Sequence, residues 1–184
     1  MVSTRGKVRI IGGEWRSRLL TFPESSDLRP TADRIRETVF NWLGQDLSGF
    51  KCLDLFAGSG ALGFEAASRG AERVVMVEGD ARIYNALREN KERLSAAQVE
   101  LLKMDAMAFL ESNTQKFDVI FLDPPYRLKL LPKLLPLLPA HLDNDAAVYI
   151  ETQGSWCPDS AWHVIRSGKA GQVCYQLLEL GSHG

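Results

Sequence analysis

The sequence contains little cysteine and histidine, which argues against a fold held together by disulfide bonds or by zinc. Its 184 residues include three cysteines and three histidines. The cysteines are odd in number and widely spaced, which suits neither a disulfide framework nor a zinc site, and the histidines show no ligand spacing. We therefore expect a protein of a reducing compartment that binds no metal.

Long apolar runs are missing as well. No segment is long enough to span a membrane, and the N-terminus lacks the apolar core of a signal peptide. The chain is 45% apolar and 24% charged, which is typical of a globular protein. We expect one cytoplasmic domain with a small extension, and a monomer, because nothing in the sequence points to an obligate dimer.

A strong net charge is lacking too, because the total is −1. The charge is unevenly spread, however. Residues 1–36 contain eight basic and four acidic residues, a net charge of +4 that leaves −5 for the rest. A basic arm on an acidic body fits a phosphate-facing surface, although a merely solvated face explains the charge equally well. The candidate phosphate contacts are Arg9, Arg16, Arg18, Arg29, Arg34 and Arg36.

Residues 1–30 are expected to form a basic N-terminal extension. Residues 7–11 and 15–20 alternate apolar and basic side chains around two glycines, a pattern typical of a β-hairpin. In such a hairpin Arg16 and Arg18 share one face. That face suits a nucleic-acid clamp, or a solvated edge that resists aggregation.

A helix is predicted to open the main domain, residues 31–184. Thr31 is a good N-cap residue, Asp33 is favourable in a first turn, and apolar residues then recur at helical spacing. These signals predict a helix over about residues 32–43, with Arg34 and Arg36 outside its apolar stripe.

A glycine turn follows the next predicted strand. Gly58 and Gly60 permit a tight turn where a ligand lies against bare backbone. With Gly63 they match the dinucleotide fingerprint, and Glu78, twenty residues after Gly58, suits ribose hydroxyls. Asp54 argues against a dinucleotide, because a carboxylate there repels a pyrophosphate and attracts a cation. S-Adenosylmethionine carries a sulfonium and no phosphate, so we favour it over NAD; a turn or helix cap is the minority interpretation of Asp54.

The rest of the chain alternates strands and helices. Predicted helices cover 80–94, 106–110 and 128–138, and we expect Pro132 and Pro136 to kink or shorten the last of them. Predicted strands cover 73–77, 99–103, 117–122, 146–151, 162–167 and 173–180. This order predicts an α/β, Rossmann-like, doubly wound and mostly parallel sheet of about seven strands with a C-terminal antiparallel hairpin. Ligands bind at the C-terminal ends of such strands, where Asp54, Glu78, Asp105 and Asp123 are all expected. Asp105 and the backbone N–H of Ala106 suit an adenine ring, although Asp105 is an equally good N-cap residue.

The strand over residues 117–122 ends in Asp123-Pro124-Pro125-Tyr126. The two prolines stop the strand and stiffen the backbone. The Asp123 carboxylate and the Pro124 carbonyl then form a row of acceptors beside the Tyr126 ring. Such a row suits a planar group with an NH2, although an ordinary loop is an equally good explanation of these four residues taken alone.

Four segments in order carry a family resemblance: residues 9–18, residues 29–41 beginning Arg-Pro-Thr, residues 54–63, and residues 123–126. With them the chain resembles the class I methyltransferases, and most of all the RsmD family of bacterial 16S rRNA guanine-N2 methyltransferases. The Arg-Pro-Thr segment is the specific signal, because the glycine turn and Asp-Pro-Pro-Tyr occur in many methyltransferases. The C-terminal third matches in pattern only.

The resemblance implies a reaction and a set of site residues. The donor is S-adenosyl-L-methionine, with S-adenosyl-L-homocysteine as product, and the target is a guanine at position 966 of 16S rRNA in an assembled small ribosomal subunit. The implied cofactor-binding residues are Asp54, Phe56, Ala57, Gly58, Ser59, Gly60, Glu78, Asp105 and Ala106. The residues implied to take the base are Asp123, Pro124 and Tyr126.

Other functions remain open from the sequence alone. A DNA amino-methyltransferase usually needs a target-recognition segment, for which this chain has no room. A protein-glutamine methyltransferase usually has Asn where Asp123 stands. A nicotinamide oxidoreductase shares the glycine pattern. A non-catalytic ribosome-assembly factor could have kept the whole cofactor pocket.

Overall fold

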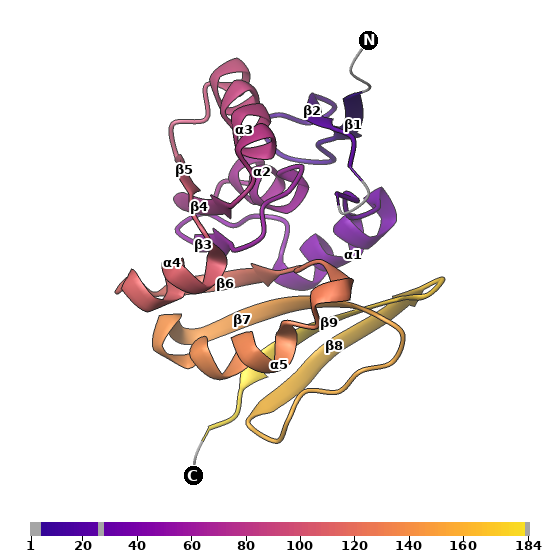
Figure 1. The fold of residues 1–184 in the computed structure, drawn as a ribbon, viewed down its shortest axis with the longest axis vertical. Coiled ribbons are helices and arrows are strands. Elements are labelled where there is room, and N and C mark those ends of the chain that lie inside the picture. Colours follow the sequence, from indigo (N-terminus) through magenta and orange to yellow (C-terminus); the bar gives the residue numbers. More distant parts are fainter. Residues whose placement is uncertain (1–4, 26–27, 183–184) are drawn as a thin grey trace.

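The structure is a computed structural model that describes residues 5–25 and 28–182, and for Arg127 it describes the backbone alone. Within these residues the chain forms a seven-stranded and a two-stranded sheet (Figure 1). The strands are β1 Arg5–Arg9, β2 Leu19–Pro23, β3 Lys51–Asp54, β4 Arg73–Glu78, β5 Val99–Lys103, β6 Phe117–Leu122, β7 Leu142–Gln153, β8 Trp162–Ala170 and β9 Val173–Leu180. The helices are α1 Asp33–Leu43, α2 Ala61–Ser68, α3 Ala81–Leu94, α4 Ala106–Ser112 and α5 Leu131–Leu134, with short 3-10 turns η1 Tyr126–Leu128, η2 Leu135–Leu137 and η3 Pro139–His141.

The large sheet has the strand order β5-β4-β3-β6-β7-β9-β8. Its first five strands are parallel, and β9 is antiparallel to both β7 and β8. The predicted doubly wound, mostly parallel sheet with a closing hairpin is thus confirmed. The chain runs outward from β3 to β5 and then returns to β6 on the other side of β3. Such a reversal opens a crevice at the strand ends, where ligands bind in this class of fold.

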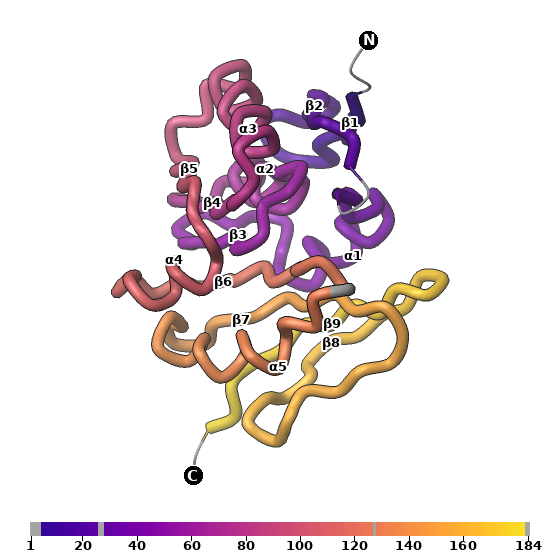
Figure 2. The backbone as a smooth tube through the Cα atoms, in the orientation of Figure 1, coloured from indigo at the N-terminus to yellow at the C-terminus, as the bar shows by residue number. Residues whose placement is uncertain are grey.

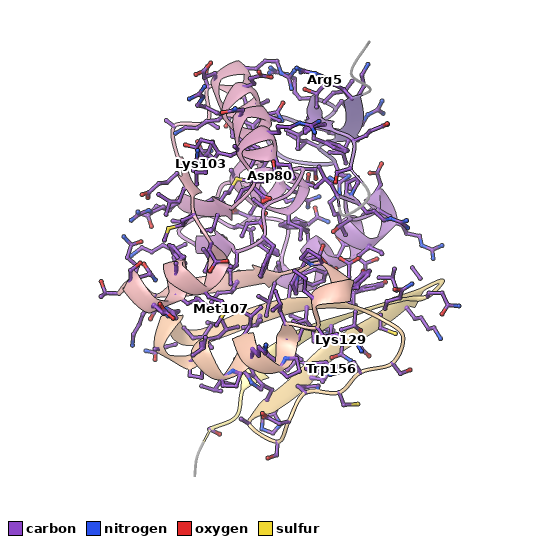
Figure 3. All side chains as sticks on the ribbon, viewed as in Figure 1. Arg5, Asp80, Lys103, Met107, Lys129 and Trp156 are labelled. Atoms are coloured by element: carbon purple, nitrogen blue, oxygen red, sulfur yellow. The ribbon has the colours of Figure 1, made fainter. Side chains whose placement is uncertain are left out.

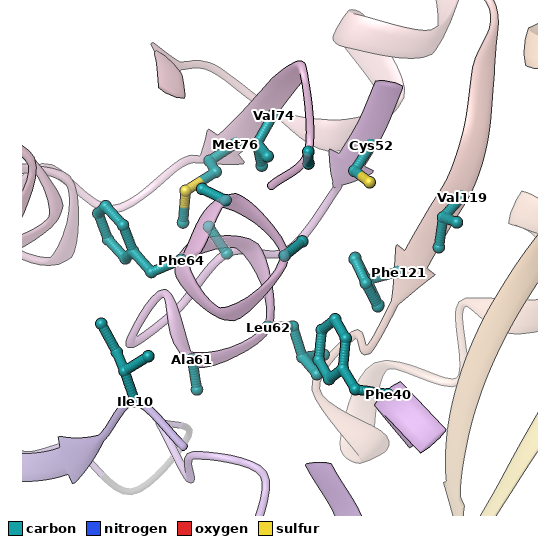
Figure 4. Packing of buried hydrophobic residues seen from close by; sticks show 14 of the residues in the cluster. Ile10, Phe40, Cys52, Ala61, Leu62, Phe64, Val74, Met76, Val119 and Phe121 are labelled. Atoms are coloured by element: carbon teal, nitrogen blue, oxygen red, sulfur yellow. The ribbon is translucent and has the colours of Figure 1, made fainter. Parts of the chain in front are cut away.

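Each face of the sheet has its own apolar core. On one face Cys52 and Phe121 belong to the core that also includes residues of α1 and α2 (Figure 4). On the other face Leu53 and Ile120 pack with residues of α4 and α5. Neighbours along one strand therefore point into different cores, as the two-residue period of a strand requires. This explains why the central strands are nearly continuous apolar runs. In the part of the chain that the structure describes, no helix is long and apolar enough to cross a membrane.

The N-terminal hairpin is shorter than predicted. β1 and β2 pair from Arg9–Leu19 to Arg5–Pro23, and residues 10–18 form the connecting loop. The predicted strand over residues 15–20 is therefore wrong for its first four residues, and Arg16 and Arg18 lie in the loop rather than on a strand face.

The loop is shaped by its contact with α2. Gly13 has φ of 79°, and a Cβ there would lie 2.0 Å from the carbonyl oxygen of Ser68. The Ser68 hydroxyl also accepts a hydrogen bond from the Trp15 backbone N–H at 2.9 Å. Because the loop must follow the end of α2, it cannot close as a two-residue turn.

The extension is attached to the main domain by hydrogen bonds to two helices. Glu65 in α2 accepts from the backbone N–H groups of Ile11 and Gly12, at 2.9 and 3.0 Å. Arg93 in α3 donates to the carbonyl oxygen of Leu19 at 2.6 Å. The backbone trace shows the hairpin beside α3, with β8 and β9 toward the opposite end of the molecule (Figure 2). The extension thus shares one core with the main domain.

Prolines break the helix that was predicted over residues 128–138. Pro132 and Pro136 stand at the starts of α5 and η2, where a missing N–H costs least. The segment is therefore a series of short turns. β7 begins at Leu142, four residues before the predicted start at residue 146.

Candidate active site

Four acids lie at neighbouring strand ends on one edge of the sheet. Asp54 ends β3 and Glu78 ends β4, while Asp105 and Asp123 follow β5 and β6 closely. Because β3 lies between β4 and β6, Asp54 stands between Glu78 and Asp123. The structure therefore brings the predicted acids together at the point where the strand order reverses.

The glycine turn between β3 and α2 has a backbone that favours glycine. Gly58 has φ of 55° and Gly60 has φ of 84°, and a Cβ on Gly60 would lie 2.5 Å from the Phe64 ring. The turn is tied to both flanking strands, because the N–H groups of Leu55 and Ala57 donate to carbonyls of β6 and β4 at 3.2 and 3.0 Å. It is thus a fixed stretch of bare backbone. Of the other predicted turn residues, Phe56 is partly exposed, and Ala57 and Ser59 are buried.

Asp54 is buried and caps α2 from across the turn. Its Oδ2 accepts a hydrogen bond from the backbone N–H of Gly63, in the first turn of the helix, at 3.0 Å. The cap interpretation, which carried little weight from the sequence, therefore applies. Burial raises the pKa of Asp54 from 3.8 to about 7, an effect larger than the opposing one of the hydrogen bond.

Glu78 has a similar pKa for related reasons. Burial, followed by the charges of Asp54 and Asp80, raises the pKa of Glu78 from 4.5 to about 7. Asp80 stands at the start of α3 (Figure 3), and its side chain accepts hydrogen bonds from the backbone N–H groups of Arg82 and Ile83. Near neutral pH two carboxyl groups beside the turn are thus poised to ionise when a cation binds.

Asp105 and Ala106 lie at the next strand end. Asp105 is exposed, and its Oδ2 accepts from the backbone N–H of Ala108 at 3.1 Å, which confirms it as the N-cap of α4. Met104 donates from its backbone to the Glu78 carbonyl at 3.1 Å. This pairing keeps the start of α4 next to the end of β4.

The corner from Asp123 to Tyr126 follows β6 directly. Part of Asp123 is exposed to solvent, whereas its carboxyl group is buried. Burial, then the charges of Glu151 and Asp54, and then a hydrogen bond with Glu151, raise the pKa of Asp123 well above its ordinary value. The Tyr126 hydroxyl donates to Glu151 Oε1 at 3.0 Å. The corner is therefore joined to β7 by both of these side chains.

Glu151 is a site residue that the sequence interpretation missed. It is 6% exposed and lies near the end of β7, where Ile150 pairs with Leu122 of β6. Besides Tyr126, it receives hydrogen bonds from the hydroxyls of Thr31 and Tyr149, at 3.2 and 3.1 Å. The signal was present, because an acid ends the predicted strand over residues 146–151, just as acids end or closely follow the other parallel strands.

Thr31 does not cap α1 as predicted. Ala32 occupies the N-cap position, which has no side-chain hydrogen bond, and the Thr31 hydroxyl donates to Glu151 instead. The residue joins the segment before α1 to the site rather than stabilising the helix.

Arg36 corrects a second prediction. Its side chain is fully buried, donates to the backbone carbonyls of Arg9 and Thr31 at 2.8 and 3.1 Å, and forms ion pairs with Asp33 and Glu65. The predicted phosphate contact is therefore wrong for Arg36. Lying off the apolar stripe of α1, it faces the extension and not the solvent.

The other five predicted phosphate contacts are exposed: Arg9, Arg16, Arg18, Arg29 and Arg34. Arg18 also donates to the carbonyl oxygen of Arg93 at 3.2 Å. Burial and the charges of Glu151 and Asp123 raise the pKa of Tyr126, and the charge of Arg29 lowers it.

Comparison with known proteins gives the family. A family model described as "Conserved hypothetical protein 95" matches residues 8–179. The chain is 40% identical to ribosomal RNA small subunit methyltransferase D of Escherichia coli (strain K12), over 99% of this chain and 94% of the relative. The chain belongs to the RsmD family. The Haemophilus influenzae protein of the same name is also 40% identical, over 96% of both chains.

Solved structures agree with the RsmD assignment. A putative methyltransferase, yhhF, from Escherichia coli has a TM-score of 0.85 at 39% identity, covering 97% of this chain and 100% of that one. A putative methylase from Haemophilus influenzae has a TM-score of 0.79 at 38% identity, covering 94% and 98%. The protein is a methyltransferase, and S-adenosylmethionine is the donor that the sequence predicts for it.

The residues of the site fit this donor. Gly58 and Gly60 leave the turn without side chains, at backbone angles where a Cβ would be strained. The carboxyl groups of Asp54 and Glu78 suit a positively charged ligand and would repel a pyrophosphate.

The pKa values of Asp54 and Glu78 predict how donor binding depends on pH. Both carboxyl groups, with pKa about 7, attract a cation only when ionised. Affinity for S-adenosylmethionine should therefore rise about tenfold between about pH 6 and pH 8, as one such group ionises. Isothermal titration calorimetry at both pH values measures this. S-Adenosylhomocysteine lacks the sulfonium charge but keeps the amino group and the ribose, so its affinity should rise less over the same pH range. Equal pH dependence of the two ligands would contradict the assignment.

Proposed function

We propose that this RsmD-family protein transfers a methyl group to the exocyclic N2 of a guanine in 16S rRNA, in the assembled small ribosomal subunit. The observation that carries the proposal is the corner from Asp123 to Tyr126, which stands next to the glycine turn where the strand order reverses. The relatives named ribosomal RNA small subunit methyltransferase D support the choice of substrate. A monomer that acts in the cytoplasm is part of the proposal.

The donor would be held by three neighbouring strand ends. The turn from Phe56 to Gly60 holds the methionine moiety, Glu78 the ribose hydroxyls, and Asp105 with the Ala106 N–H the adenine. These assignments follow the order of β3, β4 and β5 in the sheet.

The target amine would be oriented by the corner. When bound, the donor supplies an electrophilic methyl carbon on a sulfonium sulfur. The Asp123 carboxylate and the Pro124 carbonyl accept the two amine hydrogens, which turns the nitrogen lone pair out of conjugation with the ring. The fixed φ of the prolines keeps the two acceptors in place.

Proton transfer and base stacking complete the mechanism. No strong base is needed first, because the methylated nitrogen is acidic enough to release its proton afterwards to Asp123 or water. The guanine must leave its stack to reach the corner, and the Tyr126 ring replaces the lost stacking.

Methyl transfer to purified subunits tests the proposal. Small ribosomal subunits from a strain that lacks this protein are incubated with tritiated S-adenosylmethionine and the enzyme, and the RNA is digested to nucleosides. Label in N2-methylguanosine is the expected result. Label in another nucleoside would mean a different target atom, and label in ribosomal protein a different substrate class. No label would leave an assembly factor that kept the fold.

Charge reversal in the hairpin loop tests the RNA-binding surface. Arg16→Glu with Arg18→Glu should weaken RNA binding about tenfold or more and flatten the slope of log affinity against log salt by about 1.5, because two phosphate contacts are lost. Fluorescence anisotropy over a salt series measures both. The matched control reverses Arg166 and Lys169, exposed on β8 at the other edge of the sheet. A slope equal to that of the control would reject the assignment.

A further inference from the structure

Glu151 has no assigned part in the reaction, yet it contacts the corner directly. It is buried, and a buried carboxylate is costly unless hydrogen-bond donors satisfy it. Three hydroxyls do so, those of Thr31, Tyr126 and Tyr149, at 3.0 to 3.2 Å. We call these four residues the Glu151 cluster.

The cluster connects the corner with the segment that precedes α1. Thr31 belongs to this segment, and its neighbour Arg29 lies close enough to Tyr126 for its charge to act there. At the other end of the segment, Leu28 approaches the glycine turn, since a Cβ on Gly58 would lie 2.8 Å from its side chain. One short segment thus approaches the glycine turn through Leu28 and is joined to the corner through Glu151, which accepts hydrogen bonds from both Thr31 and Tyr126.

Asp123 stands next to the cluster on the adjacent strand. Leu122 of β6 pairs with Ile150 of β7, so the following residues, Asp123 and Glu151, are side by side. Two carboxyl groups in such a position repel each other when both are ionised. Glu151 therefore affects the reacting carboxylate as well as the aromatic ring beside it.

We propose that Glu151 is a positioning residue for methyl transfer: its carboxylate holds the Tyr126 ring and the Thr31 segment around the corner, and it keeps a negative charge next to Asp123. The inference rests on the proposed function, in which Asp123 accepts the amine hydrogens and Tyr126 stacks on the base. Glu151 itself touches neither substrate.

The charge of Glu151 has a consequence for pH dependence. Burial first, and Glu151 second, raise the pKa of Asp123 well above its ordinary value. Activity that needs the Asp123 carboxylate is then lost as pH falls through this raised pKa. The titratable and charged groups that act on the corner are Glu151, Asp54, Tyr126, Tyr149 and Arg29.

Glu151→Gln is the variant that tests this. It keeps the shape of the side chain and removes its charge. We expect kcat to fall about 10- to 100-fold near neutral pH through loss of positioning. Donor affinity should stay within about twofold, because the variant leaves the glycine turn intact. The acid limb of the pH–rate profile should move to lower pH by about one unit, because the pKa of Asp123 falls when the neighbouring charge is removed. A merely structural role would lower the rate at every pH and leave the limb in place, and that result would overturn the proposal.

Tyr149→Phe is the matched control. It removes one hydrogen bond to Glu151 and leaves the charge, so the acid limb should not move. If Glu151→Gln fails to fold, Tyr126→Phe keeps the test decisive, because it removes only the hydroxyl that joins the ring to Glu151. A fall of about fivefold or more in kcat is expected for Tyr126→Phe, and an unchanged kcat would overturn the positioning role.

Thermal unfolding separates this inference from the proposed function. The raised pKa of Asp123 means that its contribution to stability is full below the unfolded-state pKa and is lost as pH rises through the folded-state value. Glu151→Gln lowers the pKa of Asp123 in the folded state, so the variant loses less stability than wild type as pH rises. The melting temperature of the variant minus that of wild type should therefore increase between about pH 4 and about pH 8. A constant difference would reject the charge coupling. If the wild type methylates no subunit while the melting temperatures follow this trend, the proposed function fails and the coupling stands.

Discussion

Asp123→Ala is expected to lower the turnover number at least 100-fold, about 3 kcal/mol of transition-state stabilisation, with donor affinity little changed. The proposed role of the carboxylate is to orient the amine, and alanine leaves one of its hydrogens without an acceptor. In the proposed mechanism donor binding depends on the glycine turn and Glu78, which the substitution does not alter. Single-turnover kinetics with tritiated donor measures the first effect, and calorimetry measures the second.

The loss should not come from unfolding. Asp123 has a pKa raised by burial and by Glu151, so its ionisation near neutral pH opposes folding, and the alanine variant should be at least as stable as wild type. Asp118→Ala is the control, because Asp118 lies near the start of the same strand and accepts from the Lys51 backbone at 2.8 Å. Its turnover should match wild type. Turnover near normal in Asp123→Ala would remove the corner from the mechanism.

Glu65→Gln should lower the free energy of unfolding by about 3–5 kcal/mol, because it leaves the buried Arg69 without its counter-charge and Arg36 with Asp33 alone. Glu65 is fully buried and pairs with Arg36 at 3.6 Å and Arg69 at 2.9 Å, while it also accepts from the backbone of the extension. An amide presents one oxygen and one NH2, so some of these donors lose their acceptor. Urea denaturation followed by circular dichroism measures the loss.

An exposed ion pair provides the comparison. Glu100 pairs with Arg73, and both side chains are more than a third exposed. Glu100→Gln should therefore cost less than about 1 kcal/mol. Similar losses of unfolding free energy for Glu65→Gln and Glu100→Gln would show that the attachment of the extension does not depend on the buried ion pairs of Glu65.

The sheet could be predicted because its strands are buried on both faces. Apolar runs such as residues 117–122 have one reasonable interpretation, and their spacing leaves room for crossover helices. The acids at the strand ends followed from the same reasoning. What the sequence does not contain is which strands are neighbours. The pairing of β6 with β7, which brings Glu151 beside Asp123, depends on long-range packing.

The errors have a common cause. The apolar stripe of a helix predicts which side chains face the sheet. All other side chains of the helix are then predicted to be exposed to solvent. Arg36 is on the remaining surface of α1, but the extension covers it, so it is buried and paired. The second strand of the hairpin was predicted to begin too early for the same reason. The contact between Gly13 and α2 depends on tertiary packing, which the alternation of apolar and basic residues does not report.

α2 is an eight-residue helix, about 12 Å long, and each of its ends holds a different part of the proposed enzyme. The donor turn leads into its first residue, and Glu65 and Ser68 near its last turn hold the loop that carries Arg16 and Arg18. A displacement of this helix by RNA is also a displacement of the donor turn. Thermodynamic reciprocity then requires that each substrate change the dissociation constant of the other by the same factor, whichever arrives first.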